Sequence, residues 1–231
     1  MIKFIALDID GVIYSSEPFL HKAYTEAIKL FMKEQNISGY EVPSEKAILD
    51  NVGKTYRQII KSLFPGISES SGTILRVYIL NSLIAFIKQK KGILLPGVRS
   101  FLEKAREKGF LIGTGSNGSE IYCESVLATY NLSEFFNERK YVDFEKYLAK
   151  EDLLLFYINY YGILPEELLF IGDRETDVTA ARKAKCSFIG VTGHGNPSEL
   201  ASVNKIVKNL GEILPYFESS FNEEELCLKK L

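Results

Sequence analysis

Short, continuous runs of apolar residues alternate along the chain with longer segments in which apolar residues recur every three or four positions. Continuous runs are typical of strands buried on both faces of a parallel sheet, and the longer spacing is typical of helices. The runs lie at Ile2–Leu7, Phe110–Gly115, Leu168–Ile171 and Ser187–Val191, with weaker ones at Lys140–Asp143 and Lys205–Val207. The helical segments between them are Val98–Lys108, Ile121–Tyr130, Glu151–Tyr161 and Thr176–Lys185. This order predicts an α/β fold with a doubly wound parallel sheet.

The stretch from residue 15 to residue 92 interrupts this alternation. It contains no run that resembles a buried strand, and its apolar residues follow helical spacing. The helical segments are His21–Gln35, Ser44–Asn51, Lys54–Phe64 and Thr73–Lys90. We therefore expect an α/β core made of residues 1–14 and 93–231, and an all-helical cap made of residues 15–92.

Pairs of carboxylates follow two of the predicted strands. Asp8 and Asp10 come after the first strand, and Asp173 and Asp177 come after a later one. Ligands of open α/β sheets bind at the carboxyl ends of the strands, so both pairs belong to the edge where a site is expected. Each pair alone could equally cap a helix or form a turn. Together they would repel each other unless a hard divalent cation lay between them, and Mg²⁺ suits carboxylate ligands.

These motifs, taken in order, resemble the haloacid dehalogenase superfamily. The resemblance rests on Asp8-x-Asp10-Gly11-Val12, on Ser116-Asn117 after an apolar strand, on Lys150, and on Gly172-Asp173-x-x-x-Asp177. Within the superfamily the chain looks most like the phosphoglycolate phosphatase type, whose cap is inserted between the first two motifs. The resemblance implies a Rossmann-like core and a Mg²⁺-dependent phosphomonoester hydrolase acting on a small phosphorylated metabolite.

The resemblance also implies a role for each acidic residue. Asp8 would be the nucleophile that forms an aspartyl-phosphate, and Asp10 would protonate the leaving group and later activate water. Asp8, the main-chain carbonyl of Asp10, and Asp173 would bind Mg²⁺. Asp177 would reach the metal through water or orient Lys150.

Further residues would bind the substrate. Ser116 and the amide of Asn117 would hold phosphoryl oxygens, and Lys150 would neutralise their charge, with Lys146 as its competitor. Ser116 could also act as a helix N-cap. The remaining candidates for substrate binding are Gly11, at the turn after the first strand, and two cap cations, Lys54 and Arg57, that could equally be solvated helix charges.

Charge and composition restrict the partners. Lys and Arg number 28 against 30 Asp and Glu, so no broad positive field exists to bind nucleic acid. No apolar stretch reaches the roughly 18 residues of a membrane span. The N-terminus does not read as a secretory signal, and the three cysteines are widely spaced, which favours reduced thiols in the cytoplasm. We expect a cytoplasmic monomer or homodimer that binds a small phosphorylated substrate.

Three other functions remain open at this stage. A β-phosphoglucomutase-like phosphotransferase would use the same Asp8 and Asp10 but return the phosphoryl group to sugar. The sequence Gly113-x-Gly115-x-x-Gly118 matches a dinucleotide-binding fingerprint, although a lone match is weak. A non-catalytic protein could keep the fold, but it would not need clustered carboxylates. His194, in the loop after the last long strand, is expected to be structural or exposed.

Overall fold

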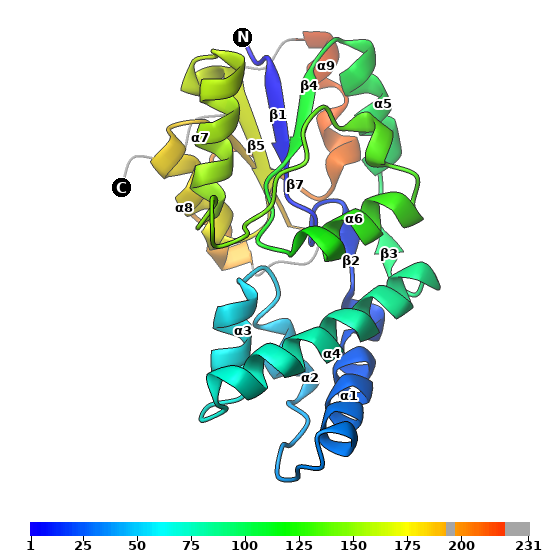
Figure 1. The fold of residues 1–231 in the computed structure, drawn as a ribbon. Coiled ribbons are helices and arrows are strands. Elements are labelled where there is room, and N and C mark those ends of the chain that lie inside the picture. The colour runs from blue at the N-terminus through cyan, green and yellow to red at the C-terminus, as the bar shows by residue number, and fades with distance from the viewer. Residues whose placement is uncertain (193–196, 220–231) are drawn as a thin grey trace.

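The computed structural model describes residues 1–192 and 197–219, and these form a sheet-containing part above a helical part (Figure 1). The sheet has five strands in the order β4-β1-β5-β6-β7, and all its strand pairs are parallel. The strands are β1 (Phe4–Leu7), β4 (Leu111–Thr114), β5 (Leu168–Gly172), β6 (Ser187–Val191) and β7 (Ile206–Val207). The predicted α/β fold class with a doubly wound parallel sheet is confirmed.

Both faces of the sheet are buried because helices cover them. Along β1, Ile5 and Leu7 belong to one hydrophobic cluster, and Phe4 and Ala6 belong to another on the opposite face. Successive side chains of a strand point to opposite faces, so a continuous apolar run is the pattern that this environment requires. The first cluster contains residues of α5 (Val98–Glu107) and α6 (Glu120–Thr129), and the second contains residues of α7 (Lys150–Tyr161) and α8 (Glu175–Ala184).

One expected detail of the core differs from the observed structure. The weak apolar patch at Lys140–Asp143 forms no strand, and Tyr141 makes an isolated parallel bridge with Ser116 instead.

The glycines that imitate a dinucleotide fingerprint are accounted for by packing. A Cβ on Gly113 would lie 2.6 Å from the ring of Phe4, and one on Gly115 would lie 2.8 Å from the ring of Phe170. These positions need glycine because aromatic side chains cross the strand there.

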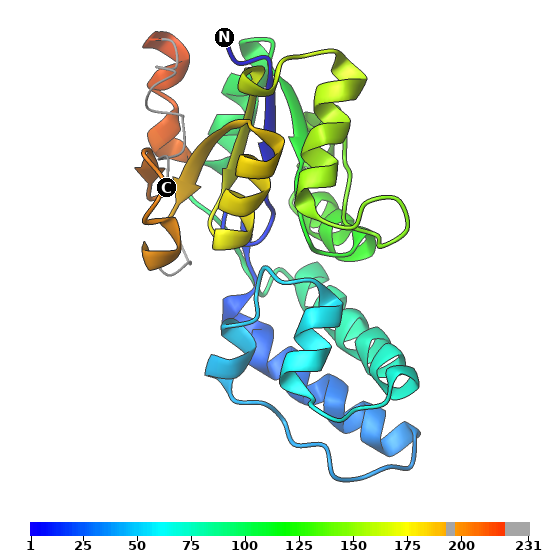
Figure 2. The same ribbon diagram turned by 90° about the vertical axis from the view of Figure 1, so that its left-hand side faces the viewer.

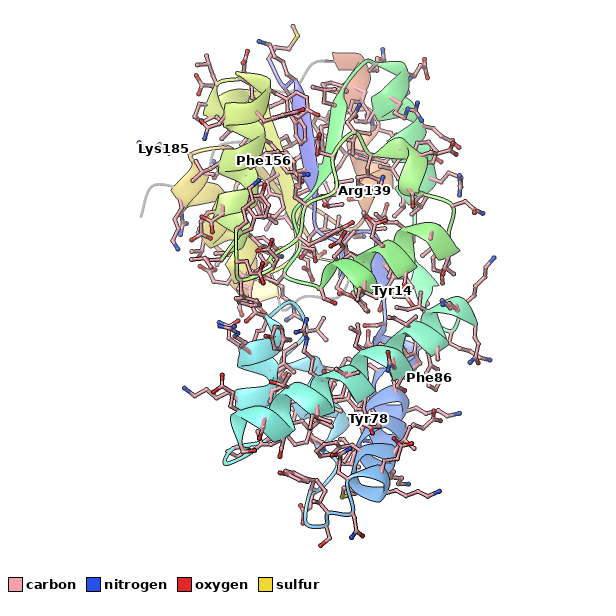
Figure 3. The ribbon with its side chains drawn as sticks, in the orientation of Figure 1. Tyr14, Tyr78, Phe86, Arg139, Phe156 and Lys185 are labelled. Carbon is pink, nitrogen blue, oxygen red and sulfur yellow. The ribbon has the colours of Figure 1, made fainter. Side chains whose placement is uncertain are left out.

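The helical part consists of four helices that bury their own apolar cluster. These are α1 (Glu17–Glu34), α2 (Glu45–Leu49), α3 (Tyr56–Leu63) and α4 (Glu69–Lys88). The long helices α1 and α4 pack along each other, and Tyr78 of α4 donates a hydrogen bond to Glu34 of α1 at 2.6 Å (Figure 3). By length and hydropathy α4 could cross a membrane, but it is also one wall of this bundle, where Leu75 and Ile79 are buried.

Two very short strands join the helical part to the core. β2 (Tyr14–Ser15) and β3 (Ile93–Leu94) pair antiparallel, at the two ends of the segment that the sequence assigns to a cap. Gly92 precedes β3, and a Cβ there would lie 2.0 Å from the hydroxyl of Tyr14. Tyr14 lies at the junction of the two parts (Figure 3). Figure 2 shows the helical part below the carboxyl ends of the strands.

Short helices complete the described chain. They are η1 (Ser133–Phe135), η2 (Pro165–Glu167), η3 (Pro197–Leu200), η4 (Leu210–Ile213) and α9 (Tyr216–Ser219). The loop histidine His194 lies outside the described residues, as does the part of the C-terminal tail that follows Ser219.

Candidate active site

Asp8 is the first residue after β1, and its carboxylate is buried at the edge of the sheet. The residue is 1% exposed. One carboxylate oxygen accepts a hydrogen bond from the backbone N–H of Ile9 at 2.7 Å, and the other accepts from Nζ of Lys150 at 2.5 Å. A buried carboxylate needs such partners because it has lost its hydration.

Asp173 and Asp177 enter the same site from the loop after β5 and the first turn of α8. Carboxylate oxygens of Asp8, Asp173 and Asp177 all lie within 4.8 Å of one another. One oxygen of Asp177 accepts hydrogen bonds from the backbone N–H groups of Asp173 (3.1 Å) and Arg174 (3.0 Å). The sheet order puts β1 beside β5, and so it joins acidic residues that are far apart in the sequence.

Burial and mutual repulsion perturb these carboxyl groups. Burial raises the pKa of Asp177 to about 6, against the opposing effect of Lys150. Burial, with the negative charges of Asp177 and Asp8, raises the pKa of Asp173 well above its usual range. Buried like charges disfavour ionisation, so three carboxylates held this close repel one another.

Lys150 supplies one positive charge to the cluster. It is the first residue of α7, is 2% exposed, and contacts Asp8 and Asp177 at 2.5 Å each. Burial lowers its pKa, but the two carboxylates outweigh burial and the net shift is upward, so it remains an ammonium group. Lys146, the competing lysine, lies exposed over the rings of Tyr147 and Phe156. Of these two lysines, the structure brings Lys150 to the carboxylates.

The carboxylate of Asp10 lies outside the three-aspartate cluster. The hydroxyl of Tyr122 donates a hydrogen bond to it at 2.7 Å. Burial raises the pKa of Asp10 to about 7, although the Tyr122 hydrogen bond opposes this shift. A carboxyl group with a pKa near neutrality can both donate and accept a proton at physiological pH.

Gly11 creates the space for Asp173. Its φ is +78°, and a Cβ at this position would lie 2.0 Å from a carboxylate oxygen of Asp173. Both the backbone conformation and the close approach require glycine. The glycine that follows Asp10 therefore allows Asp173 to join the carboxylate cluster.

Ser116 and Asn117 follow β4, on the other side of β1. The hydroxyl of Ser116 accepts a hydrogen bond from the backbone N–H of Gly118 at 3.1 Å. The side chain of Asn117 donates to the carbonyl of Gly53, in the helical part, at 2.9 Å. The segment before α6 thus contacts both parts of the molecule.

A cavity of about 130 Å³ lies between the sheet edge and the helical part. The predicted site residues that line it are Asp8, Asp10, Ser116, Asn117 and Lys54. The Lys54 ammonium group donates to the side chain of Asn51 at 3.0 Å.

Arg57 is not among the residues that line this cavity. It is exposed and lies 4.7 Å from the centre of the Phe144 ring. Of the two predicted cap cations, Lys54 therefore lines the cavity and Arg57 does not. Lys54 precedes α3, whereas Arg57 belongs to a helix face that turns toward Phe144.

Three further polar residues of the site were not predicted from the sequence. Tyr122 contacts Asp10, and Arg76 lines the cavity from α4. Arg174 lies 3.6 Å from Asp173 and 3.1 Å from Glu199. Arg174 directly follows Asp173, and this position beside a predicted metal ligand is a sequence signal that could have identified it. No sequence signal distinguishes Tyr122 or Arg76 from other residues of an amphipathic helix.

The donor set fits a hard divalent cation. It consists of carboxylate oxygens from Asp8, Asp173 and Asp177, all buried. Among these, the charge of Asp173 is compensated by Arg174 at 3.6 Å and, at longer range, by Lys150. Oxygen ligands of this kind suit Mg²⁺ and would relieve the repulsion that raises the pKa values.

Comparison with known proteins identifies the family. The model of the haloacid dehalogenase-like hydrolases matches residues 2–185. The phosphoglycolate phosphatase of Vibrio parahaemolyticus is 25% identical over 223 residues, which cover 92% of this chain and 95% of that protein.

Solved structures share the fold. A predicted phosphoglycolate phosphatase from Haemophilus somnus aligns with a TM-score of 0.78 at 18% identity, over 93% of this chain and 97% of that one. A β-phosphoglucomutase from Clostridium difficile aligns with a TM-score of 0.75 at 19% identity, over 97% and 99% of the two chains. Since the family match spans most of the chain and includes Asp8, Ser116, Lys150 and Asp173, the protein is an enzyme of the haloacid dehalogenase-like hydrolase family.

Proposed function

We propose that this enzyme hydrolyses small phosphomonoesters with Mg²⁺, through an aspartyl-phosphate on Asp8. The observation that carries the proposal is the arrangement at the end of β1, where Lys150 contacts Asp8 and Asp177 and the three aspartates converge. The relatives named phosphoglycolate phosphatase support phosphomonoester hydrolysis as the reaction. The buried thiols of Cys123 and Cys186 accord with a cytoplasmic enzyme.

In the first step, a carboxylate oxygen of Asp8 attacks phosphorus and the bond to the leaving oxygen breaks. Asp10 donates its proton to that oxygen, which departs as an alcohol. Its pKa of about 7 leaves a substantial fraction protonated at neutral pH. Lys150 stabilises the negative charge of the phosphoryl oxygens, and Ser116 and the amide of Asn117 bind them.

In the second step, the Asp10 carboxylate accepts a proton from water as the water oxygen attacks phosphorus. The bond between phosphorus and Asp8 breaks, and inorganic phosphate leaves. Asp8, the main-chain carbonyl of Asp10, and Asp173 would hold Mg²⁺, with Asp177 nearby. When bound, the ion neutralises the charge of the phosphoryl group and of the carboxylates.

The test is release of p-nitrophenol from p-nitrophenyl phosphate, with Mg²⁺ and with EDTA. We expect Asp8→Asn to lower kcat by roughly a thousand-fold or more, because the nucleophile is lost. Asp50→Asn is the matched control, since Asp50 is an exposed aspartate of the helical part that pairs with Lys46. Full activity in Asp8→Asn, or equal activity in Mg²⁺ and EDTA, would refute the proposal.

A further inference from the structure

The wall of the cavity that faces the carboxylates is mainly apolar. The helices α1, α2 and α4 contribute aliphatic and aromatic side chains to it: Leu20, Tyr24, Ile48, Ile79, Leu80 and Leu83. Several of them also belong to the apolar cluster of the helical part, so this wall is continuous with a hydrophobic core. Asp8 and Asp10 line the opposite side of the same cavity. A ligand phosphoryl group at Asp8 would therefore have its leaving group against this wall.

Three polar side chains on the same wall contact other groups of the protein. The Asn51 side chain donates to the carbonyl of Ala47 at 2.8 Å and accepts from Lys54 at 3.0 Å. The guanidinium carbon of Arg76 lies 3.6 Å from the centre of the Tyr56 ring. A sugar bound here would place most of its hydroxyl groups against apolar side chains, where they lose hydrogen bonds to water, and that is unfavourable.

From this wall we infer the substrate class: a phosphomonoester whose leaving group is an apolar ring or a short branched chain. The inference rests on the proposed phosphatase function. The cavity volume of about 130 Å³ is close to the roughly 150 Å³ of an apolar cavity that binds benzene. Because the phosphoryl group shares this cavity, one six-membered ring is the upper limit for the leaving group. A two-carbon acid such as glycolate would leave most of the apolar wall in contact with water.

A pair of matched substrates tests the inference. Cyclohexylmethyl phosphate and glucose 6-phosphate both carry a six-membered ring on a primary phosphate ester, and they differ in the hydroxyl groups and ring oxygen. We expect kcat/KM for the cyclohexyl compound to exceed that for glucose 6-phosphate by about ten-fold or more, since apolar pockets discriminate on this scale. 2-Phosphoglycolate is the third substrate and is expected to be poorer than the cyclohexyl compound.

Two variants of α4 test whether the preference for an apolar leaving group depends on the apolar wall of the cavity. Leu80→Gln places an amide at the half-buried wall position, and we expect it to lower the ratio of the two kcat/KM values by about ten-fold. Val77→Gln makes the same kind of change on the same helix at a residue that is 50% exposed, and it should leave the ratio as in the wild type. Because the measured quantity is a ratio, a partly unfolded preparation does not imitate the effect.

The outcomes separate this inference from the proposed function. If p-nitrophenyl phosphate is hydrolysed but glucose 6-phosphate or 2-phosphoglycolate is preferred over the cyclohexyl compound, the substrate class is wrong and the phosphatase function stands. If no phosphomonoester is hydrolysed, the proposed function fails. Calorimetric titration of the two ring compounds then decides the substrate class, and weaker binding of cyclohexylmethyl phosphate than of glucose 6-phosphate would overturn it.

Discussion

At the scale of single residues, the hydroxyl of Tyr122 contacts the carboxyl group of Asp10. It donates at 2.7 Å to one carboxylate oxygen. If Asp10 protonates the leaving group, its placement matters most for alcohols that leave poorly without a proton.

We predict that Tyr122→Phe lowers kcat by about ten-fold for an alkyl phosphate. For p-nitrophenyl phosphate we expect less than about two-fold, because nitrophenolate leaves without protonation. The measurement is steady-state kinetics with both substrates on the same preparation. An equal loss for the two substrates would show that Tyr122 acts only through structure.

Lys150 compensates two buried carboxylates at once, so its removal should destabilise the fold. We predict that Lys150→Met lowers the free energy of unfolding by about 3 to 5 kcal/mol in EDTA, because it breaks a buried ion pair and leaves the aspartates without a cation. Urea unfolding measures this. Lys146→Met, at the exposed lysine, should change stability by about 0.5 kcal/mol or less. Similar losses in both variants would contradict the assignment of Lys150 to the cluster.

At the scale of elements, local sequence accounts for most helices and strands but not for their ends. The spacing predicts the first cap helix from His21, yet α1 begins at Glu17 and carries a proline in its first turn. Proline suits that position because its missing N–H would have no partner there. The strand-like patch at Lys140–Asp143 lies beside the residues that follow β4, but it pairs there only through the isolated bridge between Tyr141 and Ser116.

The contact between the loop before α3 and the loop before α6 joins the two parts of the molecule. The Asn117 side chain donates to the Gly53 carbonyl across this contact. We predict that Asn117→Ala raises KM by about two- to ten-fold, the equivalent of one net hydrogen bond. Steady-state kinetics would show it, and limited proteolysis should cleave the helical part faster in the variant. An unchanged KM together with unchanged proteolysis would show that this hydrogen bond does not hold the parts together.

At the scale of the whole molecule, the acidic cluster couples stability to pH and to metal. The pKa values of Asp10 (about 7) and Asp177 (about 6) lie above the usual value of 3.8. The folded protein therefore binds these protons more tightly than the unfolded chain. Their stabilising contribution is complete below about pH 4 and is lost as pH rises through 6 to 7.

We predict that the metal-free protein loses up to about 5 kcal/mol of stability from these groups between pH 4.5 and pH 8. Mg²⁺ at pH 8 should raise Tm again, because it binds the ionised carboxylates of the folded state. Thermal unfolding in EDTA and in Mg²⁺ measures both effects. Asp10→Asn should flatten the pH dependence. A Tm that rises with pH in EDTA, or that ignores Mg²⁺, would contradict this account.

The apolar spacing and the motifs along the chain predicted the class of fold, the helical segment between residues 15 and 92, and the acidic and polar positions at the strand ends. These features are local, since the spacing of apolar residues reports whether a strand or helix is buried on one face or two. The order of Asp8, Ser116, Lys150 and Asp173 along the chain then sufficed for the family, which the comparison confirmed.

The tertiary structure decided what depends on contacts between distant segments. Lys150 rather than Lys146 reaches Asp8 across 142 positions, and Tyr122 reaches Asp10 across 112. The separation of Lys54 from Arg57 and the apolar wall opposite the carboxylates arise from the packing of the helical part on the sheet edge. The spacing of apolar residues along a helix does not indicate which distant loop or helix its faces will contact. Only the assembled sheet order and cap packing bring those atoms within hydrogen-bonding distance.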